Sequence, residues 1–354
     1  MARALQLAAR GAFTTRPNPM VGCVIAQGGE TVGEGWHQRA GEPHAEVFAL
    51  RAAGERVRGA TAYVTLEPCG LHGRTPPCVD ALIAAGVARV VVASEDVFQK
   101  NGGALERLRA AGIDVRMGLM REAARELNRG FFARIERDRP WLRVKLAMSL
   151  DGRTALANGD SKWITGEESR QDVQRWRARS GAILTGLGTV LADDPRLTLR
   201  LDDGEVAAPL WRVLLDRNLR TPAGANVLDG SAPTLVLHGD HAVPDARFAA
   251  VECVALASDE AGIDLEAALR LLAARGINEV QVEAGAKLSG ALLAKGLVDE
   301  VLVYVAPVLL GEAARPLFAG LDVGTMAQRR HLDLIESTRI GDDLRLQLRP
   351  RASG

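Results

Sequence analysis

Two short segments near the start of the chain carry residues that could hold a catalytic metal ion. The first contains His44 and, two positions later, Glu46; the second contains Cys69 and Cys78, each preceded by a proline. One imidazole and two thiolates form a three-ligand zinc site with an open fourth position, which is the arrangement of catalytic rather than structural zinc. The residue types and their order therefore predict a catalytic zinc site.

These residues suit the replacement of an exocyclic amino group on a pyrimidine by oxygen. The reaction needs a hydroxide nucleophile at neutral pH, and zinc lowers the pKa of water to about 7. It also needs a group that takes the water proton and delivers it to departing ammonia, a role for which we expect Glu46. The order His-x-Glu, Pro-Cys, Cys is the signature of zinc-dependent base deaminases, with eight residues between the cysteines instead of the usual two.

Each element has a less specific explanation. A lone histidine near a helix start is usually a surface residue, and two separated cysteines are usually unrelated buried thiols. Their joint occurrence favours the zinc site. A zinc ion could also brace the fold without catalysis, but Glu46 would then have no reason to lie beside a ligand. The other two cysteines, Cys23 and Cys253, occur in apolar segments and are interpreted as core residues.

The local sequence predicts the elements that carry these residues. Pro43 suits the first turn of a helix over residues 45–53, and a proline pair precedes a helix over residues 78–85. Cys69 follows the apolar run 62–66, interpreted as a strand. Residues two apart on a regular helix point in nearly opposite directions, so spacing alone does not bring His44 and Glu46 to one point. Their shared site is inferred from the signature.

The remaining pattern predicts an α/β protein. In the first part we expect helices at 2–10 and 104–111 and strands at 21–26, 31–36, 87–93 and 113–115, with a hairpin turn at Gly28-Gly29. After a charged, proline-ended link at 134–140, we expect strands at 142–148, 182–185, 212–216, 234–238, 279–283 and 300–306 and a helix at 265–275. The predicted domains are therefore 1–138 and 139–354.

Composition narrows the class of protein. The chain has 354 residues, which suits two domains at ~150 residues each. Its 44 basic residues balance its 44 acidic residues, so it lacks the electrostatic footprint of a polynucleotide binder, and we expect a small substrate rather than a nucleic acid. No apolar stretch is long enough to span a membrane, and the first residues do not resemble a signal peptide. Four cysteines fit a reducing cytoplasm.

Two glycine-bearing turns in the second half could bind a cofactor. The segment 183–191 fails the G-x-G-x-x-G pattern because Leu191 occupies the third glycine position. At Gly285, a strand leads into a helix whose backbone N–H groups could receive a phosphate. Both also fit ordinary strand-to-helix connections. Asp193-Asp194-Pro195 is either a helix-ending turn or a cofactor contact, and Trp163 could be a core residue.

The sequence closely resembles the bifunctional deaminase/reductase family of riboflavin biosynthesis over nearly its whole length. The motifs that carry the resemblance are residues 16–19, 21–22, 40–46, 65–69, 73–78, 145–153, 163–165, 189–195, 282–285 and 297–300. It implies a cytidine-deaminase-like three-layer α/β/α domain followed by a dihydrofolate-reductase-like α/β domain. The first would deaminate the pyrimidine ribotide 2,5-diamino-6-ribosylamino-4(3H)-pyrimidinone 5′-phosphate, and the second would reduce the ribosyl group to ribityl with NADPH.

The resemblance also assigns residues. It implies that His44, Cys69 and Cys78 bind Zn²⁺ and that Glu46 moves the protons. The residues that would face NADPH are Ala147, Trp163, Thr189, Asp193 and Gly285. Those that would face the substrate are Ser161, Arg177, Leu197, Arg200 and Glu283. The two arginines suit phosphate because guanidinium binds its oxygens in a bidentate fashion. The sequence leaves open whether the chain forms a homo-oligomer.

The chain departs from the family pattern in two loops around the deaminase site. Gly70-Leu71 occurs where the family usually has Ser-His or Ala-His, so a side chain that would donate a hydrogen bond to the substrate phosphate is missing. His72 could take over this role. The loop 96–103 is one residue shorter than usual. These departures leave an alternative open: a reductase whose deaminase domain is weakened or acts on a related pyrimidine or pteridine.

Overall fold

The computed structural model describes residues 1–71, 77–99, 103–201 and 207–351, and the chain divides into two compact units. The first comprises Met1–Asp138 with a few residues around Ala208, and the second comprises the rest of the chain. Within the expected link at 134–140, residues 134–137 are helical, because α6 (Arg129–Arg137) continues through them. Phe131 and Phe132 are buried, so apolar burial holds this highly charged segment in a helix.

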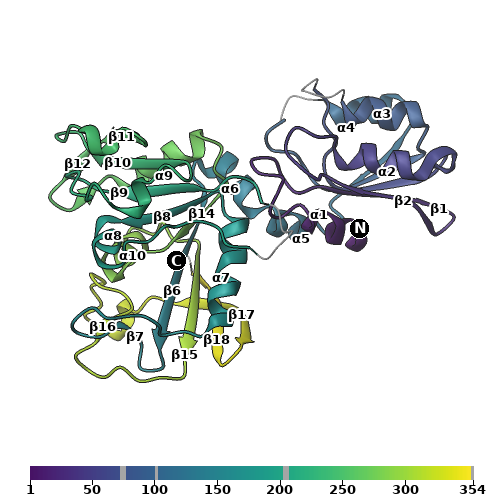
Figure 1. The fold of residues 1–354 in the computed structure, drawn as a ribbon. Helices are drawn as coiled ribbons and strands as arrows, with labels where there is room; N and C mark the ends of the chain where they lie inside the picture. The colour runs from purple at the N-terminus through teal and green to yellow at the C-terminus, as the bar shows by residue number, and fades with distance from the viewer. Residues whose placement is uncertain (72–76, 100–102, 202–206, 352–354) are drawn as a thin grey trace. The chain divides into compact units, whose positions relative to one another are not determined.

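The first unit is built on a five-stranded sheet (Figure 1). Its strands are β1 (Gly22–Gln27), β2 (Glu30–Trp36), β3 (Thr61–Leu66), β4 (Arg89–Ser94) and β5 (Asp114–Met117), in the order β2-β1-β3-β4-β5. β1 pairs antiparallel with β2 and β3, and β3, β4 and β5 are parallel. The predicted turn at Gly28-Gly29 is confirmed, with φ values of 60° and 90° that favour glycine.

Helices cover both faces of this sheet. The helices are α1 (Ala2–Ala9), α2 (Ala45–Ala53), α3 (Cys78–Ala85), α4 (Ala104–Ala110), α5 (Arg121–Leu127) and α6. α2, α3 and α4 lie side by side on one face, and α1 and α5 lie on the other (Figure 1). The expected three-layer α/β/α arrangement is confirmed. Helix α5 was not predicted from the sequence, and its exposed face is charged.

The second unit contains a nine-stranded sheet in the order β11-β10-β9-β8-β14-β6-β15-β18-β17. These strands are β6 (Trp141–Ser149), β8 (Ala182–Gly186), β9 (Trp211–Leu215), β10 (Thr234–Gly239), β11 (Glu252–Leu256), β14 (Glu279–Val282), β15 (Glu300–Ala306), β17 (Leu332–Ile340) and β18 (Asp343–Pro350). The seven strands from β11 to β15 are parallel to their neighbours, and β18 and β17 are antiparallel. The minor strands are β7 (Arg153–Ala155), β12 (Ser258–Asp259), β13 (Gly262–Ile263) and β16 (Arg315–Pro316).

Both faces of this sheet are apolar, as the strand sequences indicate. Leu184 and Val213 pack into one core cluster, which includes the buried faces of α9 (Leu265–Ala274) and α10 (Ala286–Ala294). The adjacent residues Ile183 and Leu214 point to the opposite cluster, where α8 (Leu187–Asp193) packs. α7 (Glu167–Arg179) packs beside β15 through a third, smaller cluster. None of the helices in the described ranges combines the length and hydropathy that a membrane crossing requires.

Candidate zinc and reductase sites

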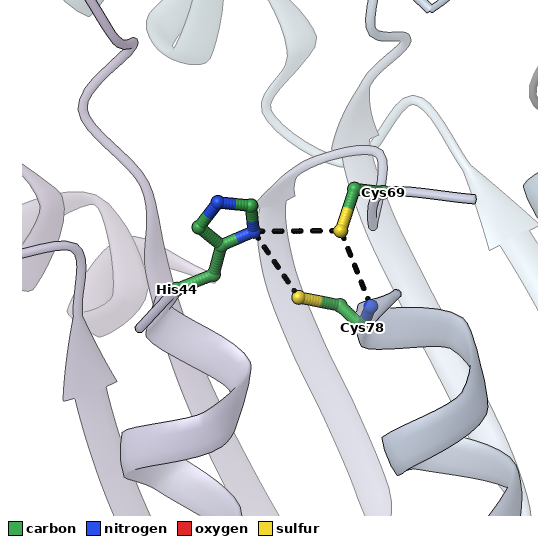
Figure 2. Close-up of side chains that lie close together, drawn as sticks. All are labelled: His44, Cys69 and Cys78. Atoms are coloured by element: carbon green, nitrogen blue, oxygen red, sulfur yellow. Dashed lines mark hydrogen bonds between the residues drawn. The ribbon is translucent and has the colours of Figure 1, made fainter. Parts of the chain in front are cut away.

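The three predicted zinc ligands converge in the first unit (Figure 2). His44 Nδ1 lies 3.3 Å from Cys78 Sγ and 3.4 Å from Cys69 Sγ. All three candidate ligand atoms lie within 4.8 Å of one another, and within the described ranges no fourth side chain joins this group. His72 and residues 73–76 of the motif lie outside the described residues. A nitrogen and two sulfur atoms at this spacing can surround one tetrahedral cation.

The backbone around His44 brings histidine and glutamate to the same place. His44 is the N-cap of α2, with an extended conformation of φ −75° and ψ 167°, whereas Glu46 is in the first helical turn. The rule that helix positions two apart diverge does not apply, because His44 precedes the helix. Glu46 lies close enough to the Cys78 thiol to contribute to the raised pKa of that thiol. The local break in helical geometry therefore permits the shared site that spacing alone did not predict.

Two glycines in β2 let α2 lie close to the sheet. A Cβ atom at Gly33 would lie 2.3 Å from the backbone oxygen of Ala49, and one at Gly35 would lie 2.3 Å from that of Ala45. Any side chain at these positions would push α2 outward. Because His44 and Glu46 are at the start of α2, this close packing of the helix against the sheet determines how deeply their side chains are buried.

Cys69 and Cys78 are held together by their own backbone. The Cys78 N–H donates to Cys69 Sγ at 3.2 Å, and the Val79 N–H donates to the Cys69 carbonyl at 3.3 Å. Cys78 is the first residue of α3, where the helix dipole favours an anion. Hydrogen bonds from Cys78 lower the pKa of Cys69 to about 4, and the same pairing raises the pKa of Cys78. The site therefore already favours a thiolate.

Glu46 is buried and incompletely paired. Among the described residues, its Oε2 has no hydrogen-bond partner. Burial raises the pKa of its carboxyl group above the ordinary value, although the nearby His44 opposes this. A buried polar atom without a partner is costly unless a ligand or water completes it. This atom and the nitrogen and sulfur donors fit a zinc site with a reacting water beside it.

A second histidine, which the sequence motifs did not indicate, supports the first. His37 Nδ1 lies 3.2 Å from the Pro43 carbonyl, and its Nε2 lies 3.1 Å from Asn18 Nδ2. Since a carbonyl only accepts, Nδ1 donates and Nε2 accepts, which defines a neutral tautomer. Burial lowers the pKa of His37, in agreement with that form. The only signal was Asn18, which belongs to a family motif without an assigned role.

In the second unit, several of the predicted residues lie at or just after the carboxyl ends of adjacent parallel strands. Ala147 lies near the end of β6, Glu283 follows β14, and Thr189 lies in the helix after β8. Because β8, β14 and β6 are neighbours and parallel, these ends share one edge of the sheet, the usual location of ligand sites in such folds. Gly285 is the exposed N-cap of α10 at the same edge.

Glu283 is the centre of a charged cluster at this edge. Arg177 donates to both of its carboxylate oxygens, and Gln281 Nε2 donates to it at 2.8 Å. Lys145, inside β6, interacts with the same carboxylate, which opposes the lowering of the Lys145 pKa by burial. No role was predicted for Lys145 from the sequence, although a lysine within an apolar strand indicates an unusual environment.

Other predicted residues differ in accessibility. Trp163 is not a core residue, since it is 71% exposed with the Arg170 guanidinium 4.7 Å from its ring centroid. Leu197 is buried in a core cluster with φ 51°, so only its backbone can reach a ligand. Arg200 is exposed, and Ser161 is half-buried.

Further expectations concerned the acidic turn after α8 and the two remaining cysteines. Asp193 ends α8, and Asp194 accepts from the Asn226 backbone at 2.8 Å, so the helix-ending turn is confirmed. Cys23 is buried as expected, whereas Cys253 is only half-buried beside the core.

Comparison with known proteins matches both units. The family model for the cytidine and deoxycytidylate deaminase zinc-binding region matches residues 1–94, and that for the RibD C-terminal domain matches residues 140–346. The chain is 49% identical to riboflavin biosynthesis protein RibD of Escherichia coli (strain K12), over 98% of each sequence.

Solved structures agree over the whole chain. Acinetobacter baumannii RibD superposes with a TM-score of 0.92 at 44% identity, covering 99% of this chain and 98% of that one. A Thermotoga maritima protein described as a diaminohydroxyphosphoribosylaminopyrimidine deaminase/5-amino-6-(5-phosphoribosylamino)uracil reductase gives a TM-score of 0.86 at 33% identity, covering 99% and 97%.

The folds and the zinc-ligand cluster define a two-domain enzyme that combines a zinc-dependent deaminase with a reductase. The chain belongs to the RibD family of bifunctional riboflavin-biosynthesis proteins. The family, the fold class and the pair of activities expected from the sequence are thereby confirmed.

Proposed function

We propose that the chain catalyses two consecutive steps on one pyrimidine ribotide. Residues 1–138 would deaminate 2,5-diamino-6-ribosylamino-4(3H)-pyrimidinone 5′-phosphate, and residues 139–354 would reduce the product's ribosyl group to ribityl with NADPH. The observation that carries the first step is the cluster of His44, Cys69 and Cys78 beside the partnerless Oε2 of Glu46. The family matches over both units support the second step.

In the deaminase site, His44, Cys69 and Cys78 would hold Zn²⁺, which supplies a water of lowered pKa when bound. Glu46 would accept a proton from that water and later donate it to the departing amine, which leaves as ammonia. Its burial suits both roles, because a raised pKa makes the carboxylate a stronger base and brings its pKa nearer to the operating pH. His37, through the Pro43 carbonyl, would keep His44 in position.

In the reductase site, Ala147, Trp163, Thr189, Asp193 and Gly285 would face NADPH. When bound, NADPH would supply the hydride that reduces the anomeric carbon of the ribosylamine, and solvent would supply the proton for the ring oxygen that is released from that carbon.

Five residues would face the substrate: Ser161, Arg177, Leu197, Arg200 and Glu283. Since the guanidinium of Arg177 is paired with Glu283, Arg177 would act by orienting that carboxylate. The exposed Arg200 would bind the phosphate group.

The decisive experiment is incubation of the purified chain with the diaminopyrimidine ribotide and NADPH. Ammonia release together with NADPH oxidation is expected, and the absence of both would refute the proposal. Oxidation measured in parallel with NADH tests the cofactor preference.

The altered Gly70-Leu71 segment motivates one alternative, a reductase with a weakened or re-targeted deaminase domain. NADPH oxidation on pre-deaminated substrate, without ammonia release at normal zinc occupancy, would favour it. Cytoplasmic location and homo-oligomerisation stay predictions, to be checked by cell fractionation and light scattering.

A further inference from the structure

The peptide groups beside Cys69 are held by two side chains from a distant part of the chain. The Gly70 N–H donates to Gln99 Oε1 at 3.2 Å, and Arg107 Nη1 donates to the Gly70 carbonyl at 2.8 Å. Gln99 follows β4, and Arg107 lies on α4, the neighbour of α3. Both hydrogen-bonding groups of the residue next to Cys69 are therefore paired with side chains.

Arg107 and Gln99 each make a further hydrogen bond to another side chain. Arg107 Nη2 donates to Asp80 Oδ1, and Asp80 lies on α3 two residues after Cys78. Gln99 Nε2 donates to Asp96 Oδ2 at 3.0 Å, which holds its amide in place. Arg107 thus bonds at once to the two segments that carry the two sulfur ligands.

The spacing of the cysteines explains why such a link is needed. Eight residues separate Cys69 from Cys78, whereas two residues suffice in related zinc deaminases. A longer loop closes with a larger entropy cost and restrains its ends less. Two thiolates also repel each other, and a tetrahedral site tolerates only small errors in ligand position. Contacts from outside the loop can add to the restraint that the backbone bonds from Cys78 and Val79 to Cys69 provide.

We propose that Arg107 and Gln99 are positioning residues that hold the Cys69 turn against α3 and so preorganise the metal site. The inference rests on the proposed zinc site and adds the residues that orient its sulfur ligands. Side chains of this kind are typically responsible for a 10-fold to 100-fold change in metal affinity. The Arg107 and Asp80 side chains are 41% and 47% exposed, so their ion pair contributes little to folding stability itself.

The test measures zinc transfer from the full-length protein to a chromogenic chelator. Arg107→Ala and Gln99→Leu should each lose zinc about 10-fold faster than the parent chain. Arg109→Ala is the matched control, because Arg109 lies on the same helix and its side chain makes, within the described part of the chain, only a 3.9 Å surface pair with Glu106. NADPH oxidation on pre-deaminated substrate should be unchanged in all three variants.

A double-mutant cycle identifies the mechanism. If Arg107 acts by joining the two segments, Asp80→Asn should also speed zinc loss, and the Arg107→Ala/Asp80→Asn pair should be no faster than Arg107→Ala alone. Should Arg107→Ala fail to fold, Gln99→Leu and Asp80→Asn carry the test.

Two results distinguish this inference from the proposed function. Zinc loss from the variants at the rate of Arg109→Ala would overturn the positioning role, even if their thermal stability fell. A parent chain without stoichiometric zinc would instead overturn the metal site itself, and the positioning role with it.

Discussion

Arg177 and Glu283, which are 106 positions apart in the sequence, form a two-bond ion pair in the second unit. Nε donates to Oε1 at 2.6 Å and Nη2 donates to Oε2 at 2.7 Å, while Nη1 donates to the Thr198 carbonyl at 2.9 Å. The two side chains are only 11% and 14% exposed. Removing either partner of such a pair lowers the free energy of unfolding, because the remaining buried charge is left uncompensated.

The Arg177–Glu283 pair should make stability depend on pH in the acid range. Burial alone would raise the pKa of Glu283, but Arg177 overcomes this and lowers it from 4.5 to about 2. A depressed carboxyl pKa stabilises the fold above the unfolded value near 4.5, and the benefit is lost as pH falls towards 2. The shift corresponds to about 3 kcal/mol of unfolding free energy.

Glu283→Gln tests this pair. The variant should be less stable than the parent chain at pH 7, by about 3 kcal/mol, and the difference should shrink between pH 4.5 and pH 2. Urea unfolding at a series of pH values measures it. Glu266→Gln, on an exposed carboxylate, is the control. A difference independent of pH would show that the pair does not hold Glu283 ionised.

Glu46→Gln should separate proton transfer from metal binding. The amide has nearly the same shape but cannot act as a general base, so ammonia release should fall by about 100-fold to 10,000-fold. Zinc content should stay stoichiometric, and NADPH oxidation on pre-deaminated substrate should be unchanged. Loss of both activities would contradict independent sites.

Zinc removal should inactivate one half of the enzyme. Dialysis against a chelator is expected to abolish ammonia release, which should return when zinc is added back, because His44, Cys69 and Cys78 provide the candidate ligands. NADPH oxidation should persist throughout. Cys78→Ser should lower zinc content in metal analysis, whereas Cys23→Ser, which removes a buried thiol outside this group, should leave it unchanged. Equal zinc content in both variants would argue against the assigned ligands.

Arg143 should be a major contributor to stability in the second unit. It is fully buried and donates to Glu300 and, at 2.8 Å, to Glu279. Arg143→Met would leave buried carboxylates without this cation, at a cost of about 3–5 kcal/mol in unfolding free energy.

Denaturant unfolding followed by tryptophan fluorescence measures the effect of Arg143→Met. The signal reports chiefly on the second unit, which contains Trp141, Trp163, Trp176 and Trp211. Arg339→Met is the control, because the Arg339 side chain is 77% exposed. A change of the same size in both variants would refute the buried-network explanation.

Local sequence was most informative where a cap or a strong apolar pattern marks an element. The helices at Ala45–Ala53 and Cys78–Ala85 have the predicted bounds, because Gly54 and Gly86 end them with positive φ angles that other residues rarely adopt. Strand β15 also has its predicted bounds, since its residues are almost all buried.

Elements with exposed or charged surfaces were missed. Edge strand β17 has mainly exposed residues, and β11 alternates only weakly, so neither has the apolar run that marks a buried strand. Helix α6 is rich in arginine, and its buried face became visible only through its contacts. In these segments tertiary packing outweighs local propensity.

By itself, the sequence determined the chemistry of the first unit: one imidazole, two thiols and a carboxylate in a defined order, on helices and strands marked by local signals. Only the tertiary structure decided that the His44 backbone is extended, that Arg177 is paired with Glu283, and that Arg107 connects the two cysteine segments. Strand order and helix packing create these contacts between residues far apart in the chain. The local periodicity of the sequence cannot predict these contacts, because it depends only on residues within a few turns of one another.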